Sequence, residues 1–268
     1  MEKPQNREVS SKQKVRSAEV GTDILKALAE LSPATSLSNL AEHVQMPASK
    51  VHRYLQALIA SGFAQQDQAT NHYSLGREAL MVGLAALASM DVLKVAAAPL
   101  AELRDELNES CFLAVWANKG ATVVQLQPAS RAVTLVTQVG SVLPLLSSAT
   151  GLVFAAYLPE AETLELRQQE LKANRNHPLA DATRYQQHVQ LVREQGLHAI
   201  HGLLMPGVDA LSAPVFDAYG RVAAVLTVVG SATVFDADEA GIAAGRLKQT
   251  AKTISWRMGY TAADEGLR

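Results

Sequence analysis

Residues 36–63 read SLSNLAEHVQMPASKVHRYLQALIASGF and carry the pattern of two helices joined by a tight turn. Ser36 can cap the first helix because its hydroxyl can accept a hydrogen bond from an otherwise unpaired backbone amide. Gln45-Met46-Pro47 supplies the turn, and Gly62 is suited to end the second helix. Apolar residues recur every three or four positions, as a buried helix face requires: Leu37, Leu40, Ala41 and Val44, then Val51, Leu55, Leu58 and Ile59.

A further helix and a hairpin flank this pair. Upstream, the same apolar spacing predicts a helix over residues 18–31, which ends before Pro33. Downstream, residues 63–67 and 72–75 are typical of two short strands around a polar turn, a wing. No Lys or Arg lies between Gly62 and Gly76, so the wing offers a phosphate backbone only neutral hydrogen bonds. We therefore predict a winged helix-turn-helix domain over residues 17–76.

The outer face of the last helix in this domain is polar. Ser49, His52, Arg53 and Gln56 recur at helical spacing on one side, with Lys50 at its edge. A plain solvent-facing surface would also be polar. In helix-turn-helix proteins this helix enters the major groove, where Arg reads guanine and Gln reads adenine. The tight turn and the few acidic residues favour DNA recognition, and we assign the contacts to Ser38, Ser49, Lys50, His52, Arg53 and Gln56.

Two segments border the domain. Residues 77–92 form a predicted linker helix that is apolar on nearly every side, for example at Leu80, Val82 and Leu84. Such a helix must be buried, so we predict a homodimer in which a partner subunit covers it, with insertion into the second domain's core as the alternative. Residues 1–16 hold five basic and two acidic residues and predict a flexible basic arm that either touches DNA or stays solvated.

Residues 93–268 combine helical and alternating patterns. Strands in two groups, with helices between them and a closing helix, predict an α+β domain. The predicted strands span residues 111–118, 121–127, 132–139, 197–201, 211–216 and 221–229, and the predicted helices span 92–108, 147–157, 160–172, 181–195 and 236–260.

Composition restricts the class of protein. The 268 residues are 48% hydrophobic and 19% charged, which excludes collagen-like, coiled-coil and wholly disordered chains. A net charge of −2 excludes a uniformly basic nucleic-acid coat. The longest apolar runs, such as 151–158, are too short to span a membrane, and residues 1–16 lack the apolar core of a signal peptide. We expect a cytoplasmic protein without a membrane partner.

The sequence offers little for catalysis. It contains no His-Glu-x-x-His, Gly-x-Ser-x-Gly or Gly-x-x-x-x-Gly-Lys motif. Cys111 begins an apolar strand, where a small buried hydrophobe is commoner than a nucleophile, and a single cysteine forms neither an internal disulfide nor a thiolate-based zinc site. His198 and His201 are three positions apart in a predicted strand and so point to opposite faces. We predict no catalytic residue, no metal site and no cofactor.

A binding pocket is the better reading of the second domain. Ser147, Ser148 and Thr150 cluster where a loop enters a helix, a place that offers free amides and a positive dipole to an anion. Simple capping of the helix by one of these hydroxyls explains the cluster equally well. Thr227 interrupts an apolar strand, so if it points inward it requires a hydrogen-bond partner from the protein or from a ligand.

Taken in order, the motifs resemble the IclR family of bacterial transcription regulators from about Ser17 to Tyr260. The segments that carry the resemblance are residues 36–55 with Gly62-Phe63, Tyr73-Ser74-Leu75-Gly76, Gly140 with Pro144-Leu145 and Thr150-Gly151, and Pro206-Gly207-Val208 with residues 213–217 and 220–222. The resemblance implies a winged helix joined by a helix to a GAF-like effector domain. It also implies dimers that pair into tetramers and bind pseudopalindromic double-stranded DNA operators.

The resemblance further implies a pocket for a small-molecule effector. The residues that match are Ser148, Ala149, Thr150, Leu204, Met205, Ser212, Pro214, Thr227 and Ser231. The chain departs from the family pattern at Gly151-Leu152-Val153, where a lysine is usual, and at residues 201–205, where acidic residues are usual. Both departures make the pocket more apolar and favour an aromatic effector over a very small organic acid.

These inferences converge on a ligand-responsive regulator without catalytic activity, whose effector is an aromatic compound or organic acid and whose target is a catabolic operon. A small-molecule-metabolising enzyme with an N-terminal interaction module is the alternative, and a dimeric scaffold is a third possibility. Turnover of candidate ligands would favour the enzyme, whereas a salt-sensitive, sequence-dependent mobility shift would favour the regulator.

Overall fold

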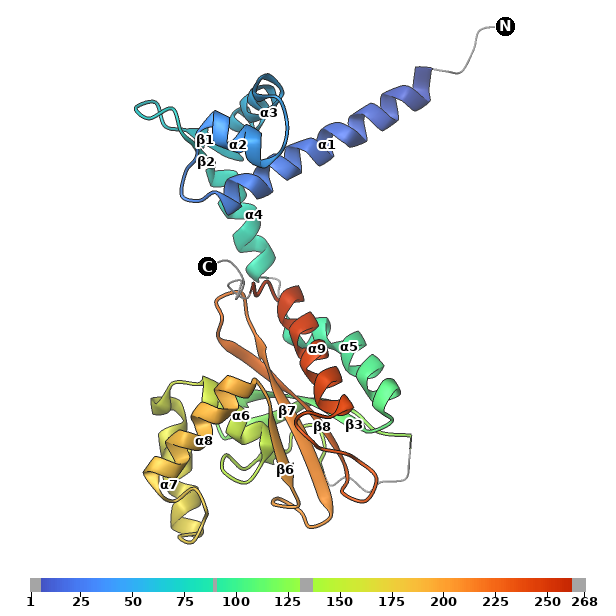
Figure 1. The fold of residues 1–268 in the computed structure, drawn as a ribbon, viewed down its shortest axis with the longest axis vertical. Coiled ribbons are helices and arrows are strands. Elements are labelled where there is room, and N and C mark those ends of the chain that lie inside the picture. The colour runs from blue at the N-terminus through green and yellow to red at the C-terminus, as the bar shows by residue number, and fades with distance from the viewer. Residues whose placement is uncertain (1–5, 89–90, 131–136, 262–268) are drawn as a thin grey trace, which may run out of the picture. The chain divides into compact units, whose positions relative to one another are not determined.

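Figure 1 shows the computed structural model of the chain, which describes residues 6–88, 91–130 and 137–261. The chain divides into two compact units, Met1–Ser89 and Met90–Arg268. Among the described residues, no helix combines the length and the apolar character needed to cross a membrane.

The first unit is a winged helix-turn-helix, as predicted. Its core includes fully buried side chains from each of the three helices that precede the hairpin, among them Ile24, Leu40 and Val51. The Asn39 amide donates to Ser36 Oγ over 3.2 Å, which confirms the predicted cap. The elements are α1 (Asn6–Glu30), α2 (Leu37–His43), α3 (Ala48–Ala60), the antiparallel strands β1 (Ala64–Gln66) and β2 (Tyr73–Leu75), and α4 (Arg77–Ala88).

The prediction of a flexible arm over residues 1–16 is wrong from Asn6 onward, because α1 begins there and continues to Glu30. No Pro or Gly interrupts residues 6–20, and most of them are residues with fair helix propensity. The polar composition of this segment therefore does not prevent it from continuing the amphipathic helix that follows it. Residues 1–5 lie outside the described part of the chain.

Helix α4 leaves large apolar side chains uncovered in the single chain. The exposed fractions are 60% for Leu80, 45% for Met81, 57% for Val82 and 46% for Leu84. The predicted linker continues to residue 92, whereas α4 ends at Ala88 and Asp91 caps the next helix by accepting from the Leu93 amide over 3.0 Å. The linker is therefore divided between two helices, with residues 89 and 90 outside the described ranges.

The second unit is an α+β sandwich around one antiparallel sheet, with strand order β5-β4-β3-β8-β7-β6. Helices α5 and α9 cover one face, and α6, α7 and α8 cover the other (Figure 1). In chain order the elements are α5 (Val92–Leu107), β3 (Ser110–Ala117), β4 (Gly120–Gln127), β5 (Val142–Leu143), α6 (Ala149–Tyr157), α7 (Glu160–Ala173), α8 (Ala182–Gln195), β6 (His198–His201), β7 (Val208–Phe216), β8 (Val222–Ser231) and α9 (Ile242–Arg257).

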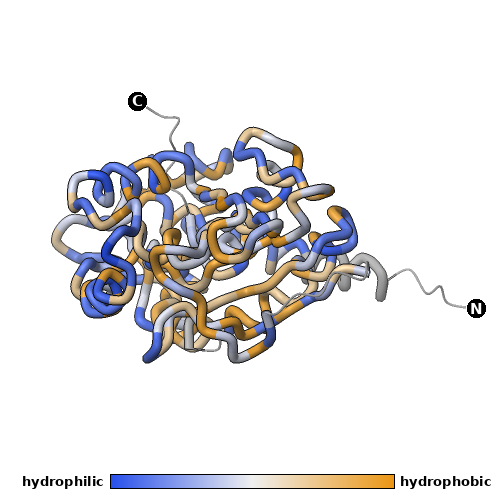
Figure 2. The backbone as a smooth tube through the Cα atoms, turned by 90° about the horizontal axis from the view of Figure 1, so that it is seen from below, coloured by the Kyte–Doolittle hydropathy of each residue, from blue (hydrophilic) through white to orange (hydrophobic). Residues whose placement is uncertain are grey.

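Side-chain alternation along the central strands divides the core of this unit in two. On β8, Leu226 and Val228 pack toward α5 and α9, while Val225 and Val229 pack toward α6 and α8. Thr227 lies between Val225 and Val229 in the same alternation and is therefore on the α6 side of the sheet. Figure 2 shows apolar stretches along the strands and polar stretches mainly in the outer coils.

The predicted strand 132–139 is not seen in its described part, residues 137–139, and its residues 132–136 lie outside the described part of the chain. The boundary of the predicted final helix is wrong. The last helix begins at Ile242 rather than at residue 236. Asp236 and Asp238 accept hydrogen bonds from backbone amides two residues ahead, at 3.0 and 2.9 Å, and such local turns compete with helix formation.

Candidate functional site

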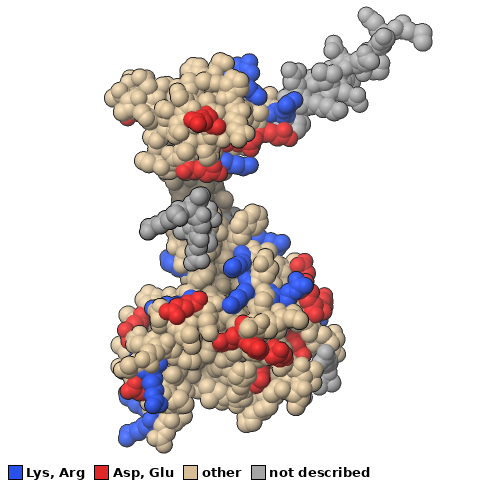
Figure 3. All heavy atoms as spheres, viewed as in Figure 1, with Lys and Arg blue, Asp and Glu red and all other residues tan. Residues whose placement is uncertain are grey.

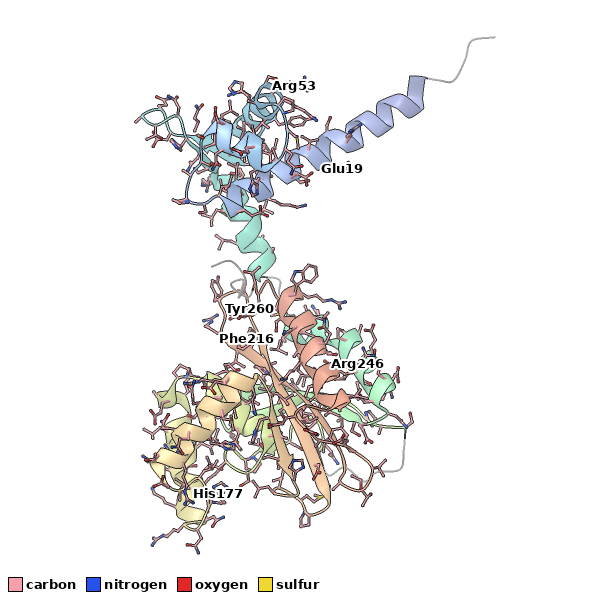
Figure 4. All side chains as sticks on the ribbon, viewed as in Figure 1. Glu19, Arg53, His177, Phe216, Arg246 and Tyr260 are labelled. Carbon is pink, nitrogen blue, oxygen red and sulfur yellow. The ribbon has the colours of Figure 1, made fainter. Side chains whose placement is uncertain are left out.

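Five of the six predicted DNA-contact residues lie on α3, and the sixth, Ser38, lies on α2. One face of α3 carries Val51 and Leu55, both fully buried, so burial fixes which side of the helix faces outward. Arg53 projects from the unit in Figure 4, with its Cζ 5.8 Å from the ring centre of Tyr54, and Figure 3 shows basic side chains in that region. Ser38, Ser49, His52, Arg53 and Gln56 are exposed, and Lys50 is half-buried.

The wing carries a negative charge near its tip. Asp67 accepts from the amides of Ala69 and Thr70 at 2.7 and 3.1 Å. These backbone hydrogen bonds, led by that from Thr70, lower the pKa of Asp67 below its ordinary value. The carboxylate shapes the tip but repels phosphate, which agrees with the expectation that the wing adds little to DNA affinity.

A pocket in the second unit lies on the face of the sheet that α6 covers. Its cavity volume is about 70 Å³, and it is partly open to solvent. The entrance of α6 and the loop between β6 and β7 both contribute to it. Its described lining contains no charged side chain: Phe112, Thr137, Leu143, Ser148, Ala149, Thr150, Ile200, Leu204, Met205, Val208, Ala210, Thr227 and Val229.

Three hydroxyl groups meet at the buried side of this pocket and form what we term the hydroxyl trio: Thr150, Ser212 and Thr227. Thr227 Oγ1 lies 2.8 Å from Thr150 Oγ1 and 2.8 Å from Ser212 Oγ, and the Thr150 and Ser212 oxygens are 3.4 Å apart. All three residues are at most 1% exposed. The partner that Thr227 requires is thus supplied by the protein, and each hydroxyl retains spare capacity to accept.

Ser148 is a helix cap. Its hydroxyl accepts from the Gly151 amide over 2.9 Å and donates to the Pro144 carbonyl over 2.6 Å. The capping alternative therefore accounts for this hydroxyl, although the residue also lines the pocket. Ser147 turns elsewhere, with its hydroxyl 3.3 Å from His177 Nε2.

Six of the nine residues assigned to the effector line the pocket, namely Ser148, Ala149, Thr150, Leu204, Met205 and Thr227. Ser212 is not in the pocket lining but contacts the lining residue Thr227 within the hydroxyl trio. Pro214 is buried further along β7, and Ser231, at the end of β8, pairs its hydroxyl with Thr233 over 2.9 Å. Neither residue is in the pocket lining, although Ser231 is the ladder partner of Val208, which is.

Sequence reasoning missed most of the apolar wall. Phe112 is the clearest case, since it is the ladder partner of Thr227 across β3 and β8. Its position requires knowing that β3 pairs with β8, more than 100 residues later in the chain. Ala210 and Val229, in contrast, follow from period-two alternation with Ser212 and Thr227. Alternation was therefore an available signal for two of the missed residues.

Among the described residues, the histidines are not part of any group of three or more His, Cys, Asp or Glu side chains that could hold a metal ion. On β6, His198 is buried and His201 is exposed, which confirms that they face opposite ways. His198 Nε2 lies 3.2 Å from His188 Nε2, and burial, with His188 beside it, lowers the pKa of His198 to about 4. Burial also raises the pKa of the Cys111 thiol to about 12, so this cysteine is a buried apolar residue and not a thiolate.

The chain matches two family models, the IclR helix-turn-helix domain over residues 17–68 and the bacterial transcriptional regulator IclR C-terminal domain over residues 84–256. It is similar to the solved structure of Pseudomonas aeruginosa HmgR, with 73% identity, coverage of 94% of this chain and 100% of that chain, and a TM-score of 0.88.

Curated relatives agree. The chain is 28% identical over 244 residues to the HTH-type transcriptional regulator KipR of Bacillus subtilis, covering 89% of this chain and 97% of that protein. It is 25% identical over 219 residues to the transcriptional repressor IclR of Escherichia coli, covering 81% and 80%. These relatives are regulators and not enzymes, and the matched models span both units. The chain belongs to the IclR family of bacterial transcriptional regulators.

Proposed function

We propose that this regulator is a homodimer that contacts a pseudopalindromic operator with its α3 helices. Its affinity for the operator changes when a small aromatic compound or organic acid occupies the pocket. The observation that supports this most is the combination of an exposed helix carrying basic residues with a largely apolar pocket in the other unit, whose described lining has no charged side chain. The relative in Escherichia coli is named a repressor, and we extend repression of a catabolic operon to this chain as part of the proposal.

The chemistry of the pocket supports the effector class. Apolar walls such as Phe112 and Leu143 suit a ring, and the hydroxyl trio offers hydrogen bonds at one side. The α6 N-terminus adds a positive dipole for a carboxylate. The test is calorimetric titration with benzoate, phenylacetate and their ring-hydroxylated derivatives, followed by mobility shifts on an operator selected from random DNA. If the protein binds none of these compounds, the proposed effector class is contradicted.

Arg53→Ala should weaken operator binding by about 1–3 kcal/mol and relax the preference at one base position in each half-site, because a guanidinium can bond a base edge bidentately. Lys50→Ala should instead weaken binding to all sequences alike and flatten the salt dependence, as loss of a phosphate contact does. Fluorescence anisotropy over a salt series, together with repeated selection from random DNA, measures both effects.

The matched control is Arg77→Ala, since Arg77 is an exposed arginine outside α3 that pairs with Glu78 over 3.3 Å. It should leave the base preference unchanged. Normal operator affinity and preference in a folded, dimeric Arg53→Ala protein would show that the recognition face is assigned wrongly.

Thr150→Val should weaken effector binding by about 1–3 kcal/mol, because it keeps the side-chain shape but removes a hydroxyl from the hydroxyl trio and leaves two buried partners less satisfied. Operator binding without effector should persist. Because coupling is reciprocal, the same change should reduce how far a given effector concentration shifts operator affinity. Paired titrations of the free protein and of the protein–DNA complex measure both quantities.

Thr163→Val provides the control for this substitution. Thr163 is 1% exposed on α7, and its hydroxyl donates to the Glu160 carbonyl over 3.3 Å, away from the pocket. Equal effector affinity in the Thr150→Val protein and the wild type would mean that the hydroxyl serves the fold alone.

A further inference from the structure

Three consecutive residues of the loop that connects the pocket-lining residues Leu143 and Ser148 are contacted by α7 and the turn after it. Glu170 accepts from the amides of Leu145 and Leu146, one to each carboxylate oxygen, at 2.6 and 2.9 Å. His177 contacts Ser147, the next residue, through Nε2. The loop runs from β5 to α6, and its two ends, Leu143 and Ser148, both line the pocket.

The location of Glu170 is unfavourable for the helix that carries it. It lies in the last turn of α7, where the helix dipole disfavours a negative charge. Local helix stability therefore does not account for a carboxylate here. Two charge-assisted hydrogen bonds to loop amides do, since such bonds are shorter and stronger than neutral ones.

His177 reinforces the same loop with a defined tautomer. Its Nδ1 accepts from the Leu179 amide over 3.1 Å, so the ring proton sits on Nε2, which can donate to Ser147 Oγ. Burial lowers the pKa of His177 from its ordinary value, which favours this neutral form. Figure 4 labels His177 in the turn that follows α7.

On its inner side, the loop has no space to move toward α6. A Cβ on Gly151 would overlap the Pro144 carbonyl oxygen and lie 2.6 Å from Leu145 Cα, so the loop backbone touches the first turn of α6. On its outer side, α7 is tied to α8, because the Arg167 guanidinium stacks 3.7 Å from the ring centre of Tyr185. The loop is thus held between α6 on one side and the α7–α8 layer on the other.

We propose that Glu170, supported by His177, is the positioning residue of the effector pocket, holding the 144–148 loop in the shape that the effector requires and coupling the outer α7–α8 layer to pocket occupancy. This inference rests on the proposed function of the pocket. Glu170 itself is not in the pocket lining, so its influence passes through the loop.

Glu170→Gln tests the inference, because a glutamine offers one acceptor oxygen and turns its NH₂ toward the other amide. We expect effector affinity for the tightest-binding compound of the benzoate and phenylacetate panel to fall about 10-fold or more. Operator affinity without effector should stay within twofold of wild type. Glu162→Gln, an exposed glutamate in the first turn of the same helix, should behave as wild type in both measurements.

Amide hydrogen exchange gives a readout that does not depend on a ligand. The Leu145 and Leu146 amides should exchange at least 10-fold faster in Glu170→Gln, while the strand amides of β7 and β8 keep wild-type rates. If Glu170→Gln loses its cooperative thermal transition, Glu170→Asp, whose carboxylate is one methylene shorter, replaces it with the same expectations.

The outcomes separate the two proposals. Wild-type effector affinity in Glu170→Gln, or unchanged exchange at Leu145 and Leu146, would overturn the positioning role. If the wild-type protein binds no compound of the panel but the loop amides of Glu170→Gln exchange faster, the loop is held as inferred and the proposed effector class fails instead.

Discussion

Leu84→Asp should convert the protein into a monomer and lower its affinity for a two-half-site operator by on the order of 100-fold or more, because the two recognition helices then bind independently. Leu84 is one of the large apolar side chains that α4 exposes in the single chain, with Leu80, Met81 and Val82. If a second copy covers this face, as we propose, an aspartate there places an unpaired carboxylate in an apolar interface, which is strongly destabilising. Sedimentation velocity at micromolar concentration and operator mobility shifts measure the two consequences.

Leu164→Asp is the matched control for this substitution. Leu164 is 41% exposed on α7, close to the 46% of Leu84, but belongs to the outer layer of the second unit. It should leave both sedimentation and operator affinity unchanged. A wild-type protein that sediments as a monomer, or a dimeric Leu84→Asp protein with full operator affinity, would remove α4 from the proposed interface.

Gly151→Ala should lower the free energy of unfolding of the second unit by about 3 kcal/mol or more, since overpacking against backbone atoms that cannot move aside is costly. The nearest atoms to the added Cβ are the Pro144 carbonyl oxygen and the backbone of Leu145. The loop held by Glu170 has no room to retreat, so effector binding should fall together with stability. Differential scanning calorimetry should show a loss on the order of 10 °C in the melting temperature of this unit.

Gly245→Ala makes the same chemical change inside α9, where nothing lies within 4 Å of the added Cβ. Because alanine loses less backbone conformational entropy on folding than glycine, this substitution should raise the free energy of unfolding by about 0.5–1 kcal/mol. The two substitutions should therefore change the free energy of unfolding in opposite directions. If the free energy of unfolding of Gly151→Ala, measured with the same method, lies within about 1 kcal/mol of the wild-type value, the loop can shift to accommodate the added methyl group.

Much of the first unit was predictable because its signals are local. The Ser36 cap, the face of α3 that carries Arg53 and the hairpin around Asp67 each depend on residues fewer than about ten positions apart. Periodicity and capping report such short-range geometry directly. The same rules failed at α1, whose polar first half resembles a solvated arm, and at Asp236, whose side chain favours a turn over the expected helix.

The lining of the candidate pocket could be predicted only in part from local sequence patterns, because its contacts join residues that are far apart in the chain. Thr227 was singled out as a polar residue in an apolar strand, but its partners Thr150 and Ser212 are 77 and 15 residues away along the chain. Pro214 and Ser231 share the correct strands and still lie outside the pocket lining, so period two, which gives the face of a strand, does not by itself select the residues that line a pocket. Phe112 enters through the pairing of β3 with β8, which no single segment encodes.

The amino-acid sequence by itself determined the helix-turn-helix, the α+β pattern of the second unit, the exposed face of α3 and the apolar character of α4, since each follows from the order of residues within one element. Only the tertiary structure decided which hydroxyls form the trio, that Glu170 and His177 hold the pocket loop, and that Gly151 leaves no space for a side chain. Those contacts join residues 6 to 77 positions apart, most of them from different elements. Their geometry depends on how helices and strands pack against one sheet, and this packing is set by the whole core at once and not by any local pattern.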